Sequence, residues 1–236
     1  KELSNYKRPD GSQRLWNVTS WDNLKAKYID NPYWASYTSY SDENRDRVYG
    51  NAGVEWNIAK GLKATAKVHG DVYTYSVEDR IAVYSRTTSM YSEKVQRFQE
   101  FNYEAMLHYN TALKNFTLNA FIGTNLMHQR RNINNGETQG GLIIPEYYNL
   151  SNATSVLTTD KTYRKEIRSL LGNVSLGWKS MLFADATFRN DWSSTLPANE
   201  NSYFYPSFSG SFIFTELEPV KAVSWLNFGK VRLGWA

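Results

Sequence analysis

The sequence contains no cysteine among its 236 residues. This absence excludes a disulfide scaffold, a zinc–thiolate site and a thiol nucleophile. The sequence also lacks any run that approaches the ~20 apolar residues of a membrane helix, and its mean hydropathy is −0.58. A charge excess is nearly absent as well, because 27 basic and 23 acidic residues leave a net charge of +4 without a basic stretch. A nucleic-acid partner is therefore not expected.

Aromatic residues are what the sequence has in excess. They make up 15% of the chain, as 17 Tyr, 11 Phe and 8 Trp. Aromatic enrichment with low mean hydropathy suits a membrane β-barrel, whose lumen is polar and whose rims carry aromatic girdles. It also suits a secreted all-β protein that binds glycans or serves a structural role. Composition leaves both alternatives open.

The stretch Leu182–Trp192 shows a pattern that recurs along the chain. Its even positions are apolar apart from Asn190, and its odd positions from Asp185 onward are charged or carry a hydroxyl. A period of two with one apolar and one polar face predicts a β-strand. The same pattern predicts strands at about 51–58, 63–72, 102–110, 116–125, 170–178, 182–192, 205–214 and from about 227.

The predicted strands form four hairpins, joined by connections that alternate between short and long. The long connections are expected at about 74–100, 128–168 and 193–204. Residues 1–46 are expected to be mostly an extracellular loop, with one short helix near Trp21–Tyr28 and a solvated charged run at 42–47. Short turns on one side and long loops on the other are typical of an outer-membrane barrel, with the long loops outside the cell.

The aromatic residues of the apolar faces are sorted by their distance from the short turns. Tyr103 and Trp192 lie beside long connections, and a second group lies next to short turns: Trp56, Tyr109, Trp178 and Phe214. Two belts of rings are expected where a barrel crosses the two membrane interfaces, whereas the core of a soluble sheet gives no reason for this sorting. We therefore expect these apolar side chains to face lipid: Trp56, Val68, Leu107, Leu118, Val174 and Ala186.

Several stretches, in order over nearly the whole chain, carry a resemblance to a known family. They are Asn31–Trp34, Arg47–Asn51, Gly140–Pro145, Tyr148–Asn152, Arg189–Pro197, Tyr205–Ser207 and Gly229–Arg232. Together they make the sequence similar to the SusC/RagA-type TonB-dependent outer-membrane transporters.

The resemblance implies a large barrel with an N-terminal plug, located in the outer membrane of a Gram-negative bacterium. It implies TonB-driven import of oligosaccharides or oligopeptides, with no enzymatic activity and no cofactor. It also implies a SusD/RagB-like surface lipoprotein that closes over the barrel as a lid. The plug, the TonB-contacting segment and the barrel closure do not lie within this sequence, so coupling residues cannot be carried over.

We expect the chain to be an arc of about eight strands from a barrel of about 22. Its first residues resemble an interior segment and its last residues a strand, so both ends look cut. A closed eight-stranded barrel has a narrow interior filled by side chains, which does not suit charged lumen positions such as Lys63, Asp71 and Asp185. We therefore expect the first and last strands to pair with other polypeptide.

Catalytic and metal chemistry find little support in the sequence. The histidines have no metal-ligand spacing, and no Gly-x-Ser-x-Gly elbow accompanies any serine. Arg189 and Asp191 are interpreted first as a structural ion pair in the lumen and second as substrate contacts. The other candidate substrate contacts are aromatic residues of the long loops, which could stack on a substrate, pack together or contact the lid: Tyr33, Trp34, Tyr147 and Tyr148.

Overall fold

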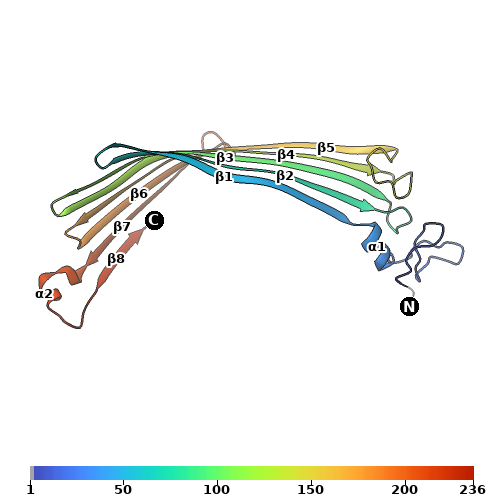
Figure 1. The fold of residues 1–236 in the computed structure, drawn as a ribbon, viewed down its shortest axis with the longest axis horizontal. Coiled ribbons are helices and arrows are strands. Elements are labelled where there is room, and N and C mark those ends of the chain that lie inside the picture. Colours follow the sequence, from blue (N-terminus) through green and yellow to red (C-terminus); the bar gives the residue numbers. More distant parts are fainter. Residues whose placement is uncertain (1–2) are drawn as a thin grey trace. The chain divides into compact units, whose positions relative to one another are not determined.

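A computed structural model describes residues 3–236, and it is dominated by one antiparallel sheet (Figure 1). The strands pair in sequence order from β1 to β8. They are β1 Ser41–Ala59, β2 Leu62–Ile81, β3 Met90–Leu113, β4 Phe116–Gln139, β5 Ser155–Trp178, β6 Leu182–Ser193, β7 Ser202–Ile213 and β8 Lys230–Trp235. The helical segments are α1 Pro32–Thr38, η1 Phe214–Glu216 and α2 Glu218–Lys221.

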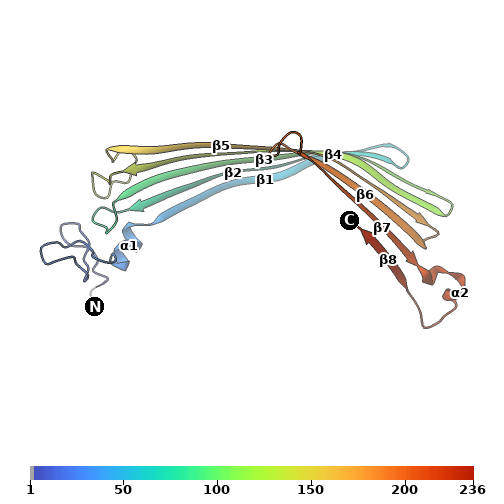
Figure 2. The same ribbon diagram turned by 180° about the vertical axis from the view of Figure 1, so that it is seen from behind.

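The sheet is open, as expected, and β1 and β8 are the two ends of the strand order (Figure 2). Within residues 3–236, these two strands do not pair with each other, so the sheet does not close as an eight-stranded barrel. The number of strands and their all-antiparallel order confirm the predicted fold class. Among the same residues, no helix is both long enough and apolar enough to cross a membrane.

The chain divides into two compact units that share several strands. Unit 1 contains the described residues up to Val48, together with Val72–Phe98 and Arg130–Tyr163. Unit 2 contains Tyr49–Asp71, Gln99–Gln129 and Arg164–Ala236. The strands β1 to β5 each begin in one unit and end in the other.

Three of the short turns lie where the sequence predicts them, between Ala59 and Leu62, between Leu113 and Phe116, and between Trp178 and Leu182. Each contains at least one residue with positive φ, such as Gly61 at 78° and Lys114 at 52°. Positive φ at the turn matches the twist of the flanking strands, which is why such turns close tight hairpins.

The fourth connection on the side of the short turns is long. Residues 214–229 link β7 to β8 and contain η1 and α2. The strict alternation of short and long connections is therefore wrong at this position, and Phe214 lies in a 3-10 helix instead of a strand.

The strands are longer than predicted, and the long connections are correspondingly shorter. Strands β3, β4 and β5 have 24 residues each, and the connections on the long-loop side are 82–89, 140–154 and 194–201. The charged run at 42–47 belongs to β1 instead of a loop. These strand ends lie in unit 1. On β1 they are polar on both faces, and on the other strands apolar and polar residues do not alternate regularly, so a pattern search does not recognise them.

The first helix is α1, at Pro32–Thr38, and the segment predicted to be helical near Trp21–Tyr28 is irregular. Asn31 is the N-cap of α1, and its side-chain oxygen accepts a hydrogen bond from the Tyr33 amide at 2.9 Å. Pro32 occupies the first turn, where its missing amide hydrogen costs nothing. The N-cap hydrogen bond of Asn31 and the proline at position 32 together fix the start of α1.

The strand register keeps an apolar face and a polar face separate in unit 2. On the apolar face, Val174 is opposite Ala186, which is opposite Phe208, which is opposite Trp235. Phe208 and Trp235 stack with ring centroids 5.9 Å apart. Large side chains of this face are exposed from β1 to β8: Val54, Trp56, Ile58, Leu107, Ile122, Leu170, Val174, Leu176, Phe208 and Trp235.

The opposite face of the same strands is a ladder of polar contacts. The Ser175 hydroxyl donates to the Asp185 carboxylate, and the Ser209 hydroxyl donates to the same carboxylate at 3.3 Å. Thr187 and Ser207 share a hydrogen bond across β6 and β7. A sheet with hydrogen-bonded polar groups on one face and exposed apolar side chains on the other has the arrangement of a barrel wall.

Candidate functional site

The described residues before β1 are organised by one buried asparagine. Asn31 is 0% exposed. Its side-chain amide donates to the carbonyl oxygens of Leu3 at 3.0 Å and Arg14 at 2.7 Å, while its backbone amide donates to the Gln13 side-chain oxygen at 3.1 Å. With the N-cap bond to Tyr33, every polar group of this side chain is used. Buried amides that are fully satisfied in this way fix one backbone arrangement.

Gln13 extends this network to the connection between β2 and β3. Its side-chain nitrogen donates to Asp30 at 2.6 Å and to the Tyr84 carbonyl at 2.7 Å. Asp30 also accepts from the Arg86 amide at 2.7 Å. The segment before β1 and the connection 82–89 are therefore held together within unit 1.

The predicted loop aromatics of α1 differ in accessibility. Trp34 is 3% exposed, and its indole nitrogen donates to the Ser85 hydroxyl at 2.9 Å. Tyr33 is exposed and stacks on Tyr37 with centroids 6.4 Å apart, and Tyr37 stacks on Tyr6 at 5.4 Å. Trp34 thus holds the cluster together, while Tyr33 and Tyr37 present rings to solvent.

Sequence reasoning missed Tyr37 and Tyr6 as partners of Tyr33. Tyr33 and Tyr37 are four residues apart on α1, a spacing that places side chains on one helix face. That spacing could have identified the pair once the helix was placed correctly. Tyr6 has no comparable signal, because it reaches the helix only through the folding of the segment before β1.

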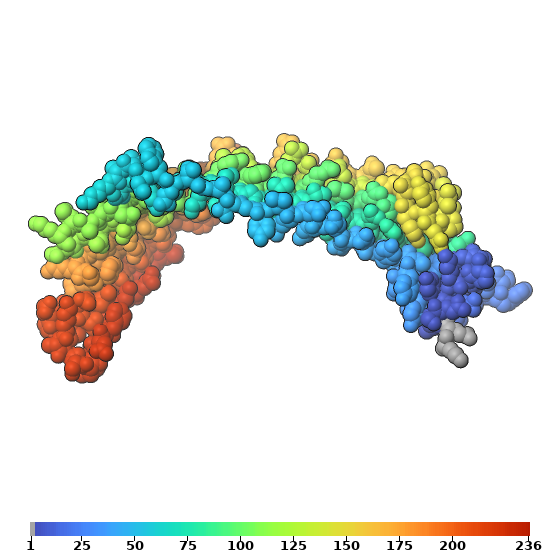
Figure 3. All heavy atoms as spheres, viewed as in Figure 1, coloured from blue at the N-terminus to red at the C-terminus, as the bar shows by residue number. Residues whose placement is uncertain are grey.

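Tyr148 joins the connection 140–154 to the same cluster, which Figure 3 shows as blue and yellow atoms of unit 1. Its hydroxyl donates to the Thr38 carbonyl at 3.1 Å, and the Arg80 guanidinium lies 5.3 Å from its ring centroid and 5.2 Å from that of Tyr40. Burial raises the pKa of Tyr148 above its ordinary value. The neighbouring Tyr147 is exposed.

The connection 140–154 is shaped by a second buried side chain, Asn152. Its amide donates to the carbonyl oxygens of Tyr147 and Ile144, the latter at 2.8 Å, and its oxygen accepts from the Ile144 amide at 2.9 Å. Tyr147 is therefore held in a defined loop at the surface. The family-like stretches Asn31–Trp34 and Tyr148–Asn152 meet in this cluster.

A polar cavity of about 340 Å³ lies among these loops in unit 1. Both members of the Lys7–Glu146 ion pair are among the lining residues, together with Arg8, Asp10 and Tyr148. Charged and hydroxyl groups around a cavity of this size can form hydrogen bonds to a small polar ligand or to one unit of a longer chain.

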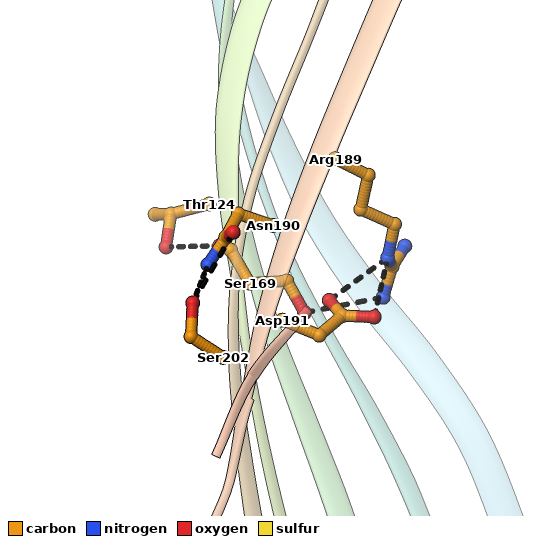
Figure 4. A network of polar contacts seen from close by, with 6 residues as sticks. All are labelled: Thr124, Ser169, Arg189, Asn190, Asp191 and Ser202. Atoms are coloured by element: carbon orange, nitrogen blue, oxygen red, sulfur yellow. Dashed lines mark hydrogen bonds and ion pairs between the residues drawn. The ribbon is translucent and has the colours of Figure 1, made fainter. Parts of the chain in front are cut away.

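Arg189 and Asp191 form the predicted ion pair on the polar face of unit 2 (Figure 4). The Arg189 Nε donates to both Asp191 oxygens, at 2.9 and 3.0 Å, and its Nη2 donates to the Ser169 hydroxyl at 3.1 Å. Ser169 is buried, and its carbonyl accepts from Thr124 at 3.0 Å. The guanidinium therefore links β6 to β5, which favours the structural interpretation of the pair.

Nearby, Asn190 and Ser202 exchange hydrogen bonds at 2.9 and 3.3 Å across the connection 194–201 (Figure 4). No group of three or more metal-ligating side chains occurs within residues 3–236. Of the histidines, His128 faces the Glu166 carboxylate at 3.2 Å and the ring of Tyr103. This pair is too small a ligand set for a metal ion.

No family model matches the sequence, and no curated protein matches it significantly. Solved structures that resemble the chain include the RagAB peptide transporter, at a TM-score of 0.80 and 16% identity. They also include the RagAB peptide importer in its "closed-closed" state, at 0.80, and its "open-open" state, at 0.79, both at 16% identity. In each case 94% of this chain matches 25% of the other chain. The likeness shows the fold, and the chain spans a quarter of the length of these neighbours.

Proposed function

We propose that this chain forms part of a large outer-membrane barrel that imports oligosaccharides or oligopeptides. The observation that carries the proposal is the likeness of nearly the whole chain to the RagAB peptide transporter. In this proposal the chain is an arc of about eight strands in a barrel of about 22. The strands β1 and β8 pair with other polypeptide, because unpaired strand edges cannot remain in hydrocarbon.

The exposed apolar face of unit 2 supports a membrane location. Large continuous apolar surfaces on a protein mark an interface with another apolar phase. This apolar face does not continue along the whole length of β1. Alternate residues of a strand share a side. The side that carries Val54 and Trp56 therefore also carries polar residues nearer the start of β1: Asp42, Asn44 and Asp46. A membrane strand needs only about 9–11 residues, so the polar strand ends of unit 1 extend beyond the hydrocarbon.

The connections 82–89, 140–154 and 194–201 lie outside the cell in this proposal, as do the residues before β1. In unit 1, Tyr33, Tyr147 and Tyr148 are the proposed substrate contacts; in unit 2, Arg189 and Asp191 lie on the proposed lumen face. A SusD/RagB-like lipoprotein closes over the barrel as a lid, and TonB drives displacement of a plug domain. Neither the plug nor the TonB-contacting segment is assigned to any residue of this chain.

Transport without catalysis fits the site. The strongest polar networks, around Asn31, Asn152 and Arg189, are hydrogen-bonded within the protein, so they hold backbone and loops in place. A general acid or nucleophile would need an accessible, activated group with a partner to orient it. The loop cluster instead offers exposed rings and a polar cavity, which are features of a binding chamber.

Uptake and ligand recovery test the proposal together. Cells with and without the gene encoding this chain would be grown on defined oligosaccharides and oligopeptides as sole nutrients. We expect the deletion strain to lose growth on at least one oligomer and to keep growth on the monomer, which crosses general porins. The intact protein should require detergent for extraction and carry that oligomer when purified. A protein that is soluble without detergent, with unchanged growth on all oligomers, would favour a secreted glycan-binding protein instead.

A further inference from the structure

The polar side of unit 1 carries an arginine whose guanidinium makes cation–π contacts with two aromatic rings. The guanidinium of Arg45, on β1, lies 5.1 Å from the ring centroid of Tyr73 and 4.9 Å from that of Tyr75, both on β2. Tyr73 and Tyr75 are two residues apart and therefore share a side of their strand. They share it with Lys63 and Lys67, the polar positions of β2 in unit 2.

The aromatic surface continues onto β3. Tyr73 and Phe98 stack with centroids 4.8 Å apart and planes inclined by 16°. The Gln96 side-chain nitrogen donates to the Tyr73 hydroxyl at 2.9 Å. Tyr73 is thus engaged by Phe98 and Arg45 at its ring and by Gln96 at its hydroxyl, which leaves less of the ring on which a sugar could stack.

A second arginine is held in the same way further along the sheet. The guanidinium of Arg131, on β4, lies 4.6 Å from the ring centroid of Tyr163 on β5. Both Arg45 and Arg131 are exposed. The sheet order places three strand spacings, roughly 14 Å, between β1 and β4. Contacts between successive strands place Arg131 about two to three residues further along the strand direction, so the two cations are separated by roughly 17 Å.

These two arginines differ from others on the sheet. Arg80, Arg168 and Arg189 each pair with a carboxylate two residues away. Within residues 3–236, by contrast, no ion pair involves Arg45 or Arg131. Glu43, which could serve Arg45, accepts a hydrogen bond from Tyr75 instead.

A guanidinium held by cation–π contacts with rings, without a carboxylate partner, keeps N–H groups available to a ligand. Those donors match the two oxygens of a carboxylate, and the ring contacts fix the guanidinium before any ligand arrives. An extended peptide advances about 3.3–3.6 Å per residue, so roughly five residues span the distance between Arg45 and Arg131.

We propose that Arg45 and Arg131 bind two carboxylates of an acidic oligopeptide that lies across β1 to β4. The two carboxylates are about five residues apart, as two acidic side chains or as one acidic side chain and the peptide's C-terminus. The engaged rings argue against an acidic glycan. This inference rests on the proposed import function and adds a charge preference to it.

The test measures affinity for matched peptides by calorimetry, using the intact transporter in detergent. One peptide carries two glutamates about five residues apart, and its control carries glutamine at both positions. We expect the acidic peptide to bind roughly 10-fold or more tightly. Added salt should reduce this preference, because the arginines are exposed.

Substitutions assign the preference to particular residues. Arg45→Gln and Arg131→Gln should each remove most of it and leave affinity for the glutamine peptide unchanged. Arg168→Gln is the control for a general loss of positive charge. This exposed guanidinium pairs with Glu166 and lies opposite Trp192, on the other side of the sheet, so the change should preserve the preference. Equal affinity of the wild-type protein for the two peptides would overturn the inference without requiring any variant to fold.

Uptake separates failure of this inference from failure of the proposed function. If cells import neutral oligopeptides or oligosaccharides through this protein without preferring acidic peptides, the import function stands and the charge preference is wrong. If no oligomer is imported or bound, the import function is wrong as well. Loss of the preference in Arg168→Gln to the same extent as in Arg45→Gln would contradict the assigned site.

Discussion

Replacing Val174 by arginine tests which face of the sheet meets lipid. Val174 is 43% exposed on the apolar face, with Ala186 directly opposite and Phe208 beyond it. None of these neighbours offers a hydrogen-bond acceptor to a guanidinium. An arginine at the middle of a membrane strand costs about 2–4 kcal/mol when it faces lipid. At about 1.4 kcal/mol per tenfold, the folding equilibrium should fall by roughly 30-fold or more.

The matched control is Ser175→Arg, one residue further and on the opposite face. The change removes the hydrogen bond from Ser175 to Asp185, which costs about 0.5–1.5 kcal/mol. The new guanidinium can pair with Asp185, which returns about 0–1 kcal/mol. The net cost should therefore be close to zero and well below that of Val174→Arg.

The assay is a urea titration of the intact transporter refolded into lipid vesicles, with each variant compared to the wild type. Fluorescence and gel mobility report the folded fraction. Equal free-energy costs at positions 174 and 175 would refute the assignment of the two faces. A larger cost at 175 would reverse it.

Three further outcomes follow from individual contacts. Gly172→Ala should destabilise the protein, because a Cβ there would lie 2.5 Å from a ring carbon of Phe188; a denaturation midpoint at or above that of the wild type would contradict this. Asn152→Ala should open the connection 140–154 to protease in whole cells, while Asn149→Ala, which affects one local turn, should change cleavage much less. Burial, together with a hydrogen bond to Glu93, raises the pKa of Tyr91 above its ordinary value of 10.0. The neutral hydroxyl is thus favoured in the folded protein, so the order of this end of β3 should be complete below pH 10 and decline above it. Protease sensitivity that is unchanged above pH 10, or identical in Tyr91→Phe, would contradict this.

The alternating part of the fold could be predicted from the sequence because one physical constraint shapes it. Strand Leu182–Trp192 must present one face to an apolar phase and one to polar groups, and its register with β5 and β7 keeps the two faces separate. The polar ends of β1 to β5 carry no such constraint. Residues 42–47 form a strand because their backbone pairs with β2. Backbone pairing leaves no periodic pattern of apolar residues in the sequence.

The candidate site could be predicted only in part. Tyr33, Trp34 and Tyr148 were identified as loop aromatics, but burial of Trp34 depends on Ser85, which comes from a different connection. The ion pair of Arg189 with Asp191 could be predicted because the two residues are two positions apart on one strand and therefore share a face. The contact of Arg45 with Tyr73 depends on the register between two strands in a region without alternation, so no sequence pattern reveals it.

The proposed orientation of the chain in an outer membrane is tested most directly by cysteine labelling. The chain has no cysteine of its own, so single cysteines at exposed positions can be probed with a membrane-impermeant maleimide on intact cells. We expect labelling at Tyr84, Glu146 and Ala198, in the three long connections, and none at Lys60 or Lys179, in the short turns, until the outer membrane is permeabilised. Labelling of Lys60 or Lys179 in intact cells with protection of the long connections would contradict the proposed barrel orientation, and equal labelling everywhere would contradict a membrane location.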